Sequence, residues 1–512
     1  MSCGALWQQT GAATTRNLWA YVNGVSGSTY YGLTTSGAAS SLVGQQKSAY
    51  IVMNAGDYVS AWVSHGVGST VYLDPSITVS FSIVQLYDFG SSAAPSRTPS
   101  QAPTANTLSP TTQVPSRAPT TPTAAFGYLQ LFSGTSQAVT PTTTLVELTT
   151  YWTLGTATKS QGTIITSTSN GRIATTTAGG YIMIYTISFA SNAGAVDTEN
   201  LAYKNANTGT PRIANSGMTV PASTSSSSCT SQIIILSAAD FISNYGYYGS
   251  STGSVIATGN PQFALIATKG QPYFLLTSST DQTIVTSTIT PLTTYFTAGT
   301  SASLGSNWLV PSLGEIQTSA AGLYYVHMDI QFAATSAGSR QAWMLMSGAL
   351  ATTSNRIAYW SRDDSTPGIR SVTAAIVNVP ANAYLQINVY QDSGGSITAA
   401  GSGLTTFGMV RVTGDSATLL SSTSQSILAN TNTELTTFWS ATRTNVVGTT
   451  IGTTLTQGRL QVSNGGAYIV TFGVTFSSGA ATSNAFRSMW VSGAYSRRSL
   501  TLLLERLTHA PK

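Results

Sequence analysis

The stretch that decides the fold is AGLYYVHMDIQF, residues 321–332. From Tyr324 to Phe332 every second residue is apolar, whereas the positions between them hold Tyr325 and then polar residues. A period of two places alternate side chains on opposite faces of an extended chain. We therefore predict a β-strand that turns one face toward a hydrophobic core.

The same alternation occurs in residues 181–189 and 468–476, and residues 384–390 also alternate. In the first of these stretches the second face carries Ile182 and Ile184, so both faces of the strand are apolar. Strands with two apolar faces are usually covered on both sides. We expect this second face to pack against a neighbouring unit or chain rather than against water.

These strands belong to an internal repeat of about 144 residues, the kind of self-similarity that defines repeat architectures. One marker is a Leu-Thr-Thr motif followed by two aromatic residues, and it begins at Leu148, Leu292 and Leu435. A second marker is a Gly-x-Tyr motif, and it begins at Gly179, Gly322 and Gly466. Both markers recur at steps of 143 and 144 residues. Phe263 and Phe407 begin a third marker near the end of each unit.

The markers divide the chain into six segments. The predicted segments are the second half of a unit (1–90), a Pro/Thr/Ser-rich linker (91–124), two complete units (125–269 and 270–414), the first half of a unit (415–496) and an atypical charged tail (497–512). We expect the linker to be disordered, because it has too little apolar surface to offset the entropy of ordering.

The two half-units together hold the markers of one whole unit. Each half alone would leave an unpaired sheet edge, which natural proteins avoid. We expect residues 1–90 and 415–493 to complete one another by strand addition, either within one chain or between two chains. Completion between chains would give an open filament. A truncated or frame-shifted fragment is the alternative explanation.

Composition restricts the classes of function. Charged residues make up 7% of the 512 residues, and the 21 basic residues are scattered singly, so we predict no nucleic-acid binding. No apolar run reaches the roughly 18 residues of a membrane span, so we predict no membrane insertion. None of the asparagines begins an N-glycosylation sequon. Chance or a bacterial origin would explain this, and so would an outer-surface protein that assembles without passing through the ER lumen, as many virion components do.

Residues capable of catalysis or metal binding do not recur with the repeat. His327 and Asp329 lie two residues apart, and we interpret them as polar residues on a solvated strand face rather than as a metal pair. We interpret Asp363 and Asp364 as an exposed turn rather than a calcium loop, and none of the glutamates at positions 147, 315 and 434 pairs with a second acid. The tryptophans could stack on sugars, but we assign most of them to cores or interfaces. We predict no enzyme activity, no cofactor and no metal.

Several strands resemble those of C1q/TNF-like domains. The stretch AGLYYV at residues 321–326 is similar to a strand of that family, as are LQINVYQ at 385–391, FGMV at 407–410 and the Gly-Asp turn at Asp57. The resemblance implies tandem antiparallel jelly-roll sandwiches, an all-β fold, and a compact trimer formed through aromatic strands of the inner sheet. Unit 270–414 departs from the pattern, because Asn382-Ala383 replaces the acidic turn. More weakly, the Pro-Ser-Arg and Ala-Pro-Thr linker is similar to linkers in structural proteins of large algal DNA viruses.

We expect a homotrimer or higher homo-oligomer. The candidate assembly residues are those of the repeated aromatic strands, namely Tyr181, Ile182, Ile184, Tyr324, Tyr325, Tyr468, Ile469, Phe263 and Phe407.

These features together favour a non-enzymatic structural or adhesive protein at a virion surface or outside the cell. It would be a fibre, spike, minor capsid-type component or filamentous appendage, with a host-surface glycan or a receptor as partner. Two alternatives are a surface carbohydrate-active enzyme with a site between protomers, and a secreted C1q/TNF-like ligand or lectin.

Overall fold

The structure is a computed structural model, and its described residues contain strands and no helix. It describes residues 6–9, 12–23, 30–37, 43–65, 71–73, 80–88, 127–133, 135–139, 145–153, 159–162, 165–167, 170–190, 196–205, 212–220, 226–249, 253–256, 261–268, 270–278, 280–293, 296–305, 308–309, 314–333, 338–347, 356–363, 370–400, 405–421, 424–428, 433–437, 439–448, 451–454, 458–464 and 466–476. The predicted linker 91–124 and the charged tail 497–512 lie outside these residues.

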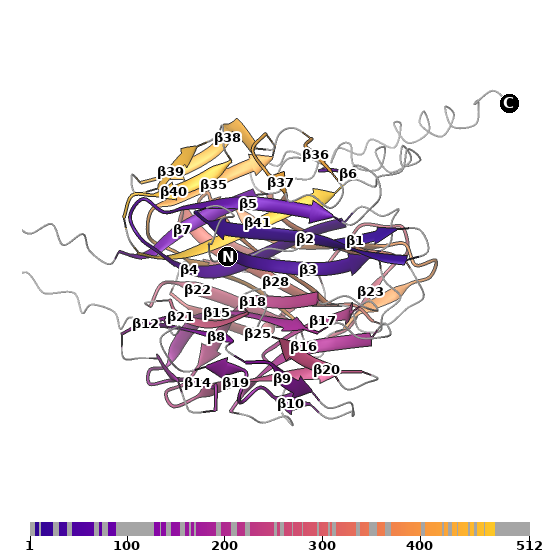
Figure 1. Ribbon diagram of the computed structural model, residues 1–512, viewed down its shortest axis with the longest axis horizontal. Helices are drawn as coiled ribbons and strands as arrows, with labels where there is room; N and C mark the ends of the chain where they lie inside the picture. Colours follow the sequence, from indigo (N-terminus) through magenta and orange to yellow (C-terminus); the bar gives the residue numbers. More distant parts are fainter. Residues whose placement is uncertain are drawn as a thin grey trace, which may run out of the picture.

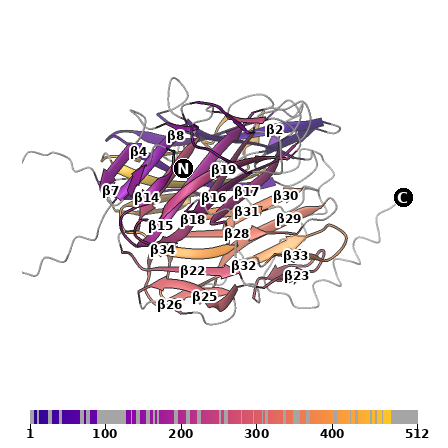
Figure 2. The same ribbon diagram turned by 90° about the horizontal axis from the view of Figure 1, so that it is seen from below.

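The strands form three jelly-roll units, each a sandwich of an inner and an outer sheet (Figures 1 and 2). We call them unit A, unit B and unit C. In unit C the inner sheet has the order β25-β22-β34-β28-β31 and the outer sheet the order β26-β27-β32-β29-β30, with β24 beside β32. The bounds are β22 Tyr273–Ser278, β24 Thr290–Pro291, β25 Phe296–Leu304, β26 Trp308–Leu309, β27 Glu315–Thr318, β28 Gly322–Gln331, β29 Ser339–Ser347, β30 Arg356–Asp363, β31 Arg370–Val379, β32 Tyr384–Gln391 and β34 Thr406–Arg411.

Unit B repeats this arrangement. Its inner sheet pairs β12, β8, β21, β15 and β18 in order, and its outer sheet has the order β13-β14-β19-β16-β17, with β10 beside β19. The bounds are β8 Gly127–Ser133, β10 Val146–Glu147, β12 Lys159–Gly162, β13 Ile165–Ser167, β14 Ile173–Thr175, β15 Gly179–Phe189, β16 Val196–Lys204, β17 Ala214–Val220, β18 Ser226–Leu236, β19 Phe241–Tyr248 and β21 Gln262–Ala267. The short strands β9 (Gln137–Val139), β11 (Trp152–Thr153) and β20 (Gly253–Ile256) also belong to it.

Unit A is assembled from both ends of the chain. Its inner sheet has the order β38-β35-β7-β41-β4, and its outer sheet contains β3, β2, β5, β40 and β39, with β37 beside β5. The bounds are β2 Ala12–Val22, β3 Tyr30–Gly37, β4 Val43–Met53, β5 Tyr58–His65, β7 Ser80–Asp88, β35 Ser416–Ser421, β37 Thr433–Glu434, β38 Trp439–Val447, β39 Ile451–Thr454, β40 Arg459–Val462 and β41 Gly466–Phe476. The remaining strands are β1 (Leu6–Gln9), β6 (Val71–Tyr72) and β36 (Ser426–Ile427) in unit A, and β23 (Gln282–Ile284) and β33 (Ile397–Ala399) in unit C.

The two half-units therefore complete one another within the same chain. Strand β7 pairs with β35 on one side and with β41 on the other, and β41 also pairs along its whole length with β4. In Figure 1 the yellow strand β41 runs among the indigo and purple strands of the N-terminal half, and β38, β39 and β40 lie at one side of them. His65 adds a side-chain link, because its Nε2 lies 2.7 Å from the carbonyl oxygen of Ile427. Since both sides of β7 are paired, strand addition from a second chain has no place there.

The Leu-Thr-Thr marker recurs because it forms one corner of each sandwich. Gln137 in unit B and Gln425 in unit A each donate from Nε2 to the backbone carbonyl just before the marker, and Gln282 does so in unit C. A glycine at positive φ, Gly458 in unit A, packs against the carbonyl oxygen of Leu435. A Cβ there would lie 2.0 Å from that oxygen, so the position requires glycine. Unit B has the same contact at Gly171 and unit C at Gly314.

Each unit has a hydrophobic core between its two sheets, and the alternating strands supply much of it. Tyr468, Tyr181 and Tyr324 lie in the cores of units A, B and C, and each hydroxyl donates to a backbone carbonyl four residues earlier. The prediction of tandem antiparallel jelly-roll sandwiches is thus confirmed. No helix among the described residues is long and apolar enough to cross a membrane.

Candidate functional sites at the unit junction and on the outer sheets

The three inner sheets turn their second faces toward one another and form a fourth hydrophobic cluster, which we call the junction. Ile182 of β15, Tyr325 of β28 and Ile469 of β41 occupy the same position of the repeat, and all three belong to the junction. Ile184 of β15 also belongs to it, and its other members come from neighbouring strands of all three units, among them Tyr50, Val84, Tyr128, Ile233, Ile266, Ile376 and Val410. The apolar second face is therefore covered by the other units of the same chain.

The nine candidate assembly residues divide by strand face. Four of them lie at the junction, namely Ile182, Ile184, Tyr325 and Ile469. The other five lie in the cores of their own units, namely Tyr181 and Phe263 in unit B, Tyr324 and Phe407 in unit C, and Tyr468 in unit A. Neighbouring residues of one strand point to opposite faces, so only one of each pair can face another unit.

Polar side chains tie unit B to unit C across the junction. The backbone N–H of Ile233 donates to Nδ1 of His327 at 3.4 Å, so Nε2 carries the proton and donates to Oγ1 of Thr406 at 3.0 Å. The hydroxyl of Tyr325 also hydrogen-bonds to the hydroxyl of Ser231. Burial lowers the pKa of His327 to about 3, because the charged imidazolium would lose its hydration. His327 is therefore a neutral interior residue.

This placement corrects one sequence interpretation. We expected His327 and Asp329 on a solvated strand face, but both are 0% exposed because units A and B cover that face. No group of three or more potential metal ligands occurs among the described residues.

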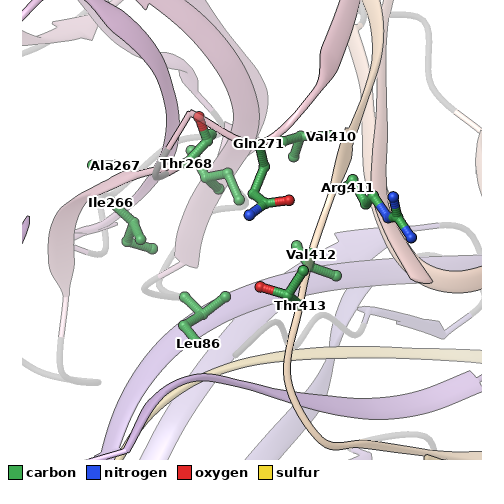
Figure 3. Close-up of a pocket in the computed structure, with 10 residues that line it drawn as sticks. Leu86, Ile266, Ala267, Thr268, Gln271, Val410, Arg411, Val412 and Thr413 are labelled. Carbon is green, nitrogen blue, oxygen red and sulfur yellow. The ribbon is translucent and has the colours of Figure 1, made fainter. Parts of the chain in front are cut away.

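Unit A and unit B are also joined at the junction. Gln130 of β8 donates to the carbonyl oxygen of Tyr50 at 3.0 Å, and the rings of Tyr50 and Tyr128 lie 4.7 Å apart. A small pocket, open to solvent, lies where the three units meet. Leu86 comes from unit A, Ile266 from unit B and Val412 from the end of unit C, and Figure 3 shows the guanidinium of Arg411 pointing away from them.

A second candidate site lies on the outward face of the outer sheet of unit A. Glu434 of β37 is paired across the sheet with Trp62 of β5, and Arg459 of β40 is paired with Ser60. Arg459 donates to both carboxylate oxygens of Glu434, from Nε at 2.8 Å and from Nη2 at 3.1 Å. Its guanidinium also lies 4.5 Å above the ring of Tyr58. The hydrogen bonds to Glu434 raise the pKa of Arg459, so the guanidinium stays charged.

Two aromatic rings complete this cluster, which we call the unit A platform. Trp62 makes an edge-to-face contact with Tyr21 of β2, with ring centres 5.8 Å apart. Trp62 is partly exposed, and its indole N–H donates to Oγ of Ser60 at 2.9 Å. The platform thus consists of Glu434, Arg459, Tyr58, Trp62 and Tyr21.

Unit B carries the same platform at the equivalent positions. Glu147 is paired across the sheet with Tyr245, and Arg172 donates to both its carboxylate oxygens at 2.6 and 2.9 Å. The guanidinium of Arg172 lies 4.8 Å above the ring of Phe241. Tyr245 makes an edge-to-face contact with Tyr203, with ring centres 5.2 Å apart. Both platforms use a glutamate next to the Leu-Thr-Thr corner and an arginine directly after its glycine, so the corner positions the ion pair.

Unit C lacks the platform. Pro291 stands opposite Asn388 where the other units have glutamate and an aromatic residue, and Glu315 occupies the arginine position. The carboxylate of Glu315 accepts a hydrogen bond from Gln386 instead. The ion pair and the edge-to-face ring pair are therefore features of units A and B.

The structure also places the other candidate residues. Trp152, Trp360 and Trp439 lie in unit cores, as expected. Trp343 is also buried, in a small cluster with Tyr359 and Tyr390 on the outward face of the outer sheet of unit C. Trp62 differs from that expectation, because it lies partly exposed on the outward face of the outer sheet of unit A. Trp19 belongs to β2, although nothing is stated of its side chain, and Trp490 and Asp364 lie outside the described residues.

Sequence reasoning missed the platforms, although a signal was present. Glu147 and Arg172 are separated by the same 25 residues as Glu434 and Arg459. The prediction for the glutamates concerned a second acid, whereas their partners are arginines. The aromatic members could not be found this way, since Tyr21 and Tyr58 lie in the other half of unit A.

Comparisons with known proteins show weak structural likeness. No protein-family model matches the chain, and no curated protein matches it. Among solved structures, the chain is similar to Eiger TNF from S. frugiperda, at 11% identity and a TM-score of 0.23, over 28% of this chain and 92% of that one. It is similar to murine APRIL at pH 8.0, at 10% identity and a TM-score of 0.23, over 28% of this chain and 99% of that one.

A longer match involves the T13 IBDV viral particle, at 8% identity and a TM-score of 0.17, over 80% of this chain and 79% of that one. At these TM-scores the likeness is slight, and the strand order of the chain itself establishes the jelly-roll fold.

Proposed function

We propose that the chain is a non-enzymatic structural or adhesive protein of an outer surface, as a fibre, spike or minor capsid-type component. The observation that supports this best is the closed body of three jelly-roll units around one junction, built by a single chain. Such a body keeps its binding faces in fixed positions, and its low charge suits recognition by shape and hydrogen bonding. A virion surface or the extracellular space is the proposed location.

A homotrimer or higher homo-oligomer of the whole chain stays a prediction. It was based on the apolar second face, and the three units of one chain already cover that face. Further copies would have to meet through other surfaces. The head-to-tail filament is set aside, because the half-units complete one another within the chain.

Immunoelectron microscopy tests the proposal. Antibodies raised against the full chain should label the outer surface of particles or appendages made by the source organism. Label confined to the cell interior would overturn the proposal. The enzyme alternative is tested in parallel by incubating the full chain with surface polysaccharides, and release of new reducing ends would favour it.

A further inference from the structure

The platforms of units A and B call for an explanation beyond stability. Only 37 of the 512 residues are charged, yet the same glutamate–arginine pair stands at equivalent positions of two units. The side chains are 13–26% exposed, and partly exposed ion pairs usually contribute little to stability. Unit C forms the same sandwich without the pair, so the fold does not require it.

We propose that the two platforms are equivalent binding sites for neutral saccharide chains, an inference that rests on the adhesive role proposed above. A sugar ring has an apolar face of C–H groups and an edge of hydroxyl groups. The partly exposed Trp62 offers an aromatic surface next to Glu434. In unit B the ring at this position, Tyr245, is buried, and the partly exposed Tyr247, which packs against it on the same outward face, offers the aromatic surface instead. Aromatic rings that are buried on one side and exposed to solvent on the other can pack against the C–H face of a sugar while its hydroxyl groups bind polar neighbours.

The ion pair supplies the polar half of the site. A guanidinium has five N–H donors, and the bidentate pair between Arg172 and Glu147 uses two of them. Carboxylate oxygens can accept more than one hydrogen bond each. The aromatic ring beneath each arginine and the carboxylate beside it hold these groups in one orientation, so little side-chain entropy is lost when a ligand binds.

Charge decides which class of saccharide fits. Each platform carries one glutamate and one arginine in direct contact, so its net charge is zero. A sialylated or sulfated chain would meet a guanidinium that is already neutralised and a carboxylate that repels it. Neutral hexose chains are therefore the ligands that the platforms favour.

The two platforms on one rigid chain make binding bivalent. Each site alone would be weak, because a shallow surface buries little of the sugar. Attachment to a glycan-coated surface through two sites raises the apparent affinity by about 100-fold or more over one site, provided that both can engage.

Isothermal titration of the full chain tests this. A glycan array with neutral hexose, sialylated and sulfated oligosaccharides first selects the neutral oligosaccharide that binds best. The unchanged chain should bind two molecules of it. Glu147→Gln and Glu434→Gln should each reduce this to one, and the double variant should bind none. Glu315→Gln, the matched change in unit C, should retain two.

The contrary outcomes are clear. Two bound molecules in the double variant, no neutral ligand on the array, or preferred binding of acidic glycans would each overturn the inference. Thermal melts of all variants show whether they are folded, and Arg172→Gln with Arg459→Gln provide a second pair of changes at the same sites. The two proposals can fail separately. If the chain binds the saccharide but the antibodies label only the cell interior, the proposed function is wrong and the saccharide sites remain.

Discussion

At the scale of single residues, the junction depends on a few polar groups that have no access to water. His327 is held neutral between Ile233 and Thr406, and Tyr325 hydrogen-bonds to Ser231 of the neighbouring unit. Burial also raises the pKa of Tyr325 well above its usual value. Because a buried polar group is costly once its partner is lost, these residues make the fit between units specific.

Acid should lower the free energy of unfolding of the protein, because His327 is buried in its uncharged form. Its pKa is about 3 in the folded protein and about 6.5 in the unfolded chain, so the unfolded chain binds the extra proton between these values. Stability is therefore full above pH 6.5 and falls as the pH drops toward 3. Protonation of His327 in the unfolded chain should lower the free energy of unfolding by about 3 kcal/mol between pH 7 and pH 4. In His327→Gln this part of the fall should be absent, as measured by urea unfolding at both pH values. An unchanged pH dependence would show that His327 titrates normally.

Tyr325 tests the apolar side of the junction. Tyr325→Asp places an unpaired charge among Ile182, Ile469 and their neighbours, and should destabilise the protein by about 4 kcal/mol or more. Tyr325→Phe removes only the hydroxyl and should cost about 1–2 kcal/mol. Urea unfolding measures both. Equal effects of the two changes would contradict a buried apolar environment at this position.

At the scale of elements, the most consequential pairing is that of β41 with β4 and β7. It joins residues more than 370 positions apart, and it gives unit A the same inner-sheet order as units B and C. A strand with both edges paired is protected from association with other chains. The N-terminal half-unit is therefore not left incomplete in the fold, because the C-terminal segment of the chain supplies the strands that it lacks.

Separate halves should recombine. We expect residues 1–90 and 415–493, expressed apart and then mixed, to gain β-structure together, since each supplies the missing strands of the same core. Far-UV circular dichroism of the mixture against the sum of the separate spectra measures this. Residues 1–90 mixed with residues 125–269 serve as the control, because that unit is already complete. If the spectra of the two halves merely add, the pairing does not form without the rest of the chain.

At the scale of the whole molecule, one chain forms a pseudo-threefold body. Three units with the same strand order contribute Ile182, Tyr325 and Ile469 to one junction, and unit C differs from the other two at this position, because it has tyrosine where they have isoleucine. The polar contacts also differ, since His327 belongs to unit C alone. The units are thus not interchangeable, and their order around the junction is set by specific contacts.

A single unit removed from this body should associate with itself. Residues 270–414 alone would expose Tyr325, Ile376 and Val410, which are buried in the chain. We expect this unit to form a trimer that restores a junction of similar shape, with three times the monomer mass by light scattering. The same unit with Tyr325→Asp should remain a monomer. A stable monomer of the unchanged unit at micromolar concentration would contradict the prediction.

Much of this architecture can be read from the residues, because the relevant signals are local or periodic. The alternation in residues 324–332 predicts a half-buried strand, and the markers near Leu148, Leu292 and Leu435 reveal the repeat. These patterns depend on neighbours along the chain and on copies of the same motif. They are enough to predict an all-β fold, the repeated sandwiches and the need to cover a second apolar face.

What covers that face could be decided only by the folded chain. Apolar residues such as Ile182 and Ile469 are buried equally well by another molecule or by another unit, because the hydrophobic effect has no direction. The same holds for the platforms, where Trp62 and Glu434 come from opposite ends of the chain and meet only when unit A closes. Contacts between distant segments depend on which closure of the chain satisfies all the strands together, and that choice leaves no local mark in the sequence.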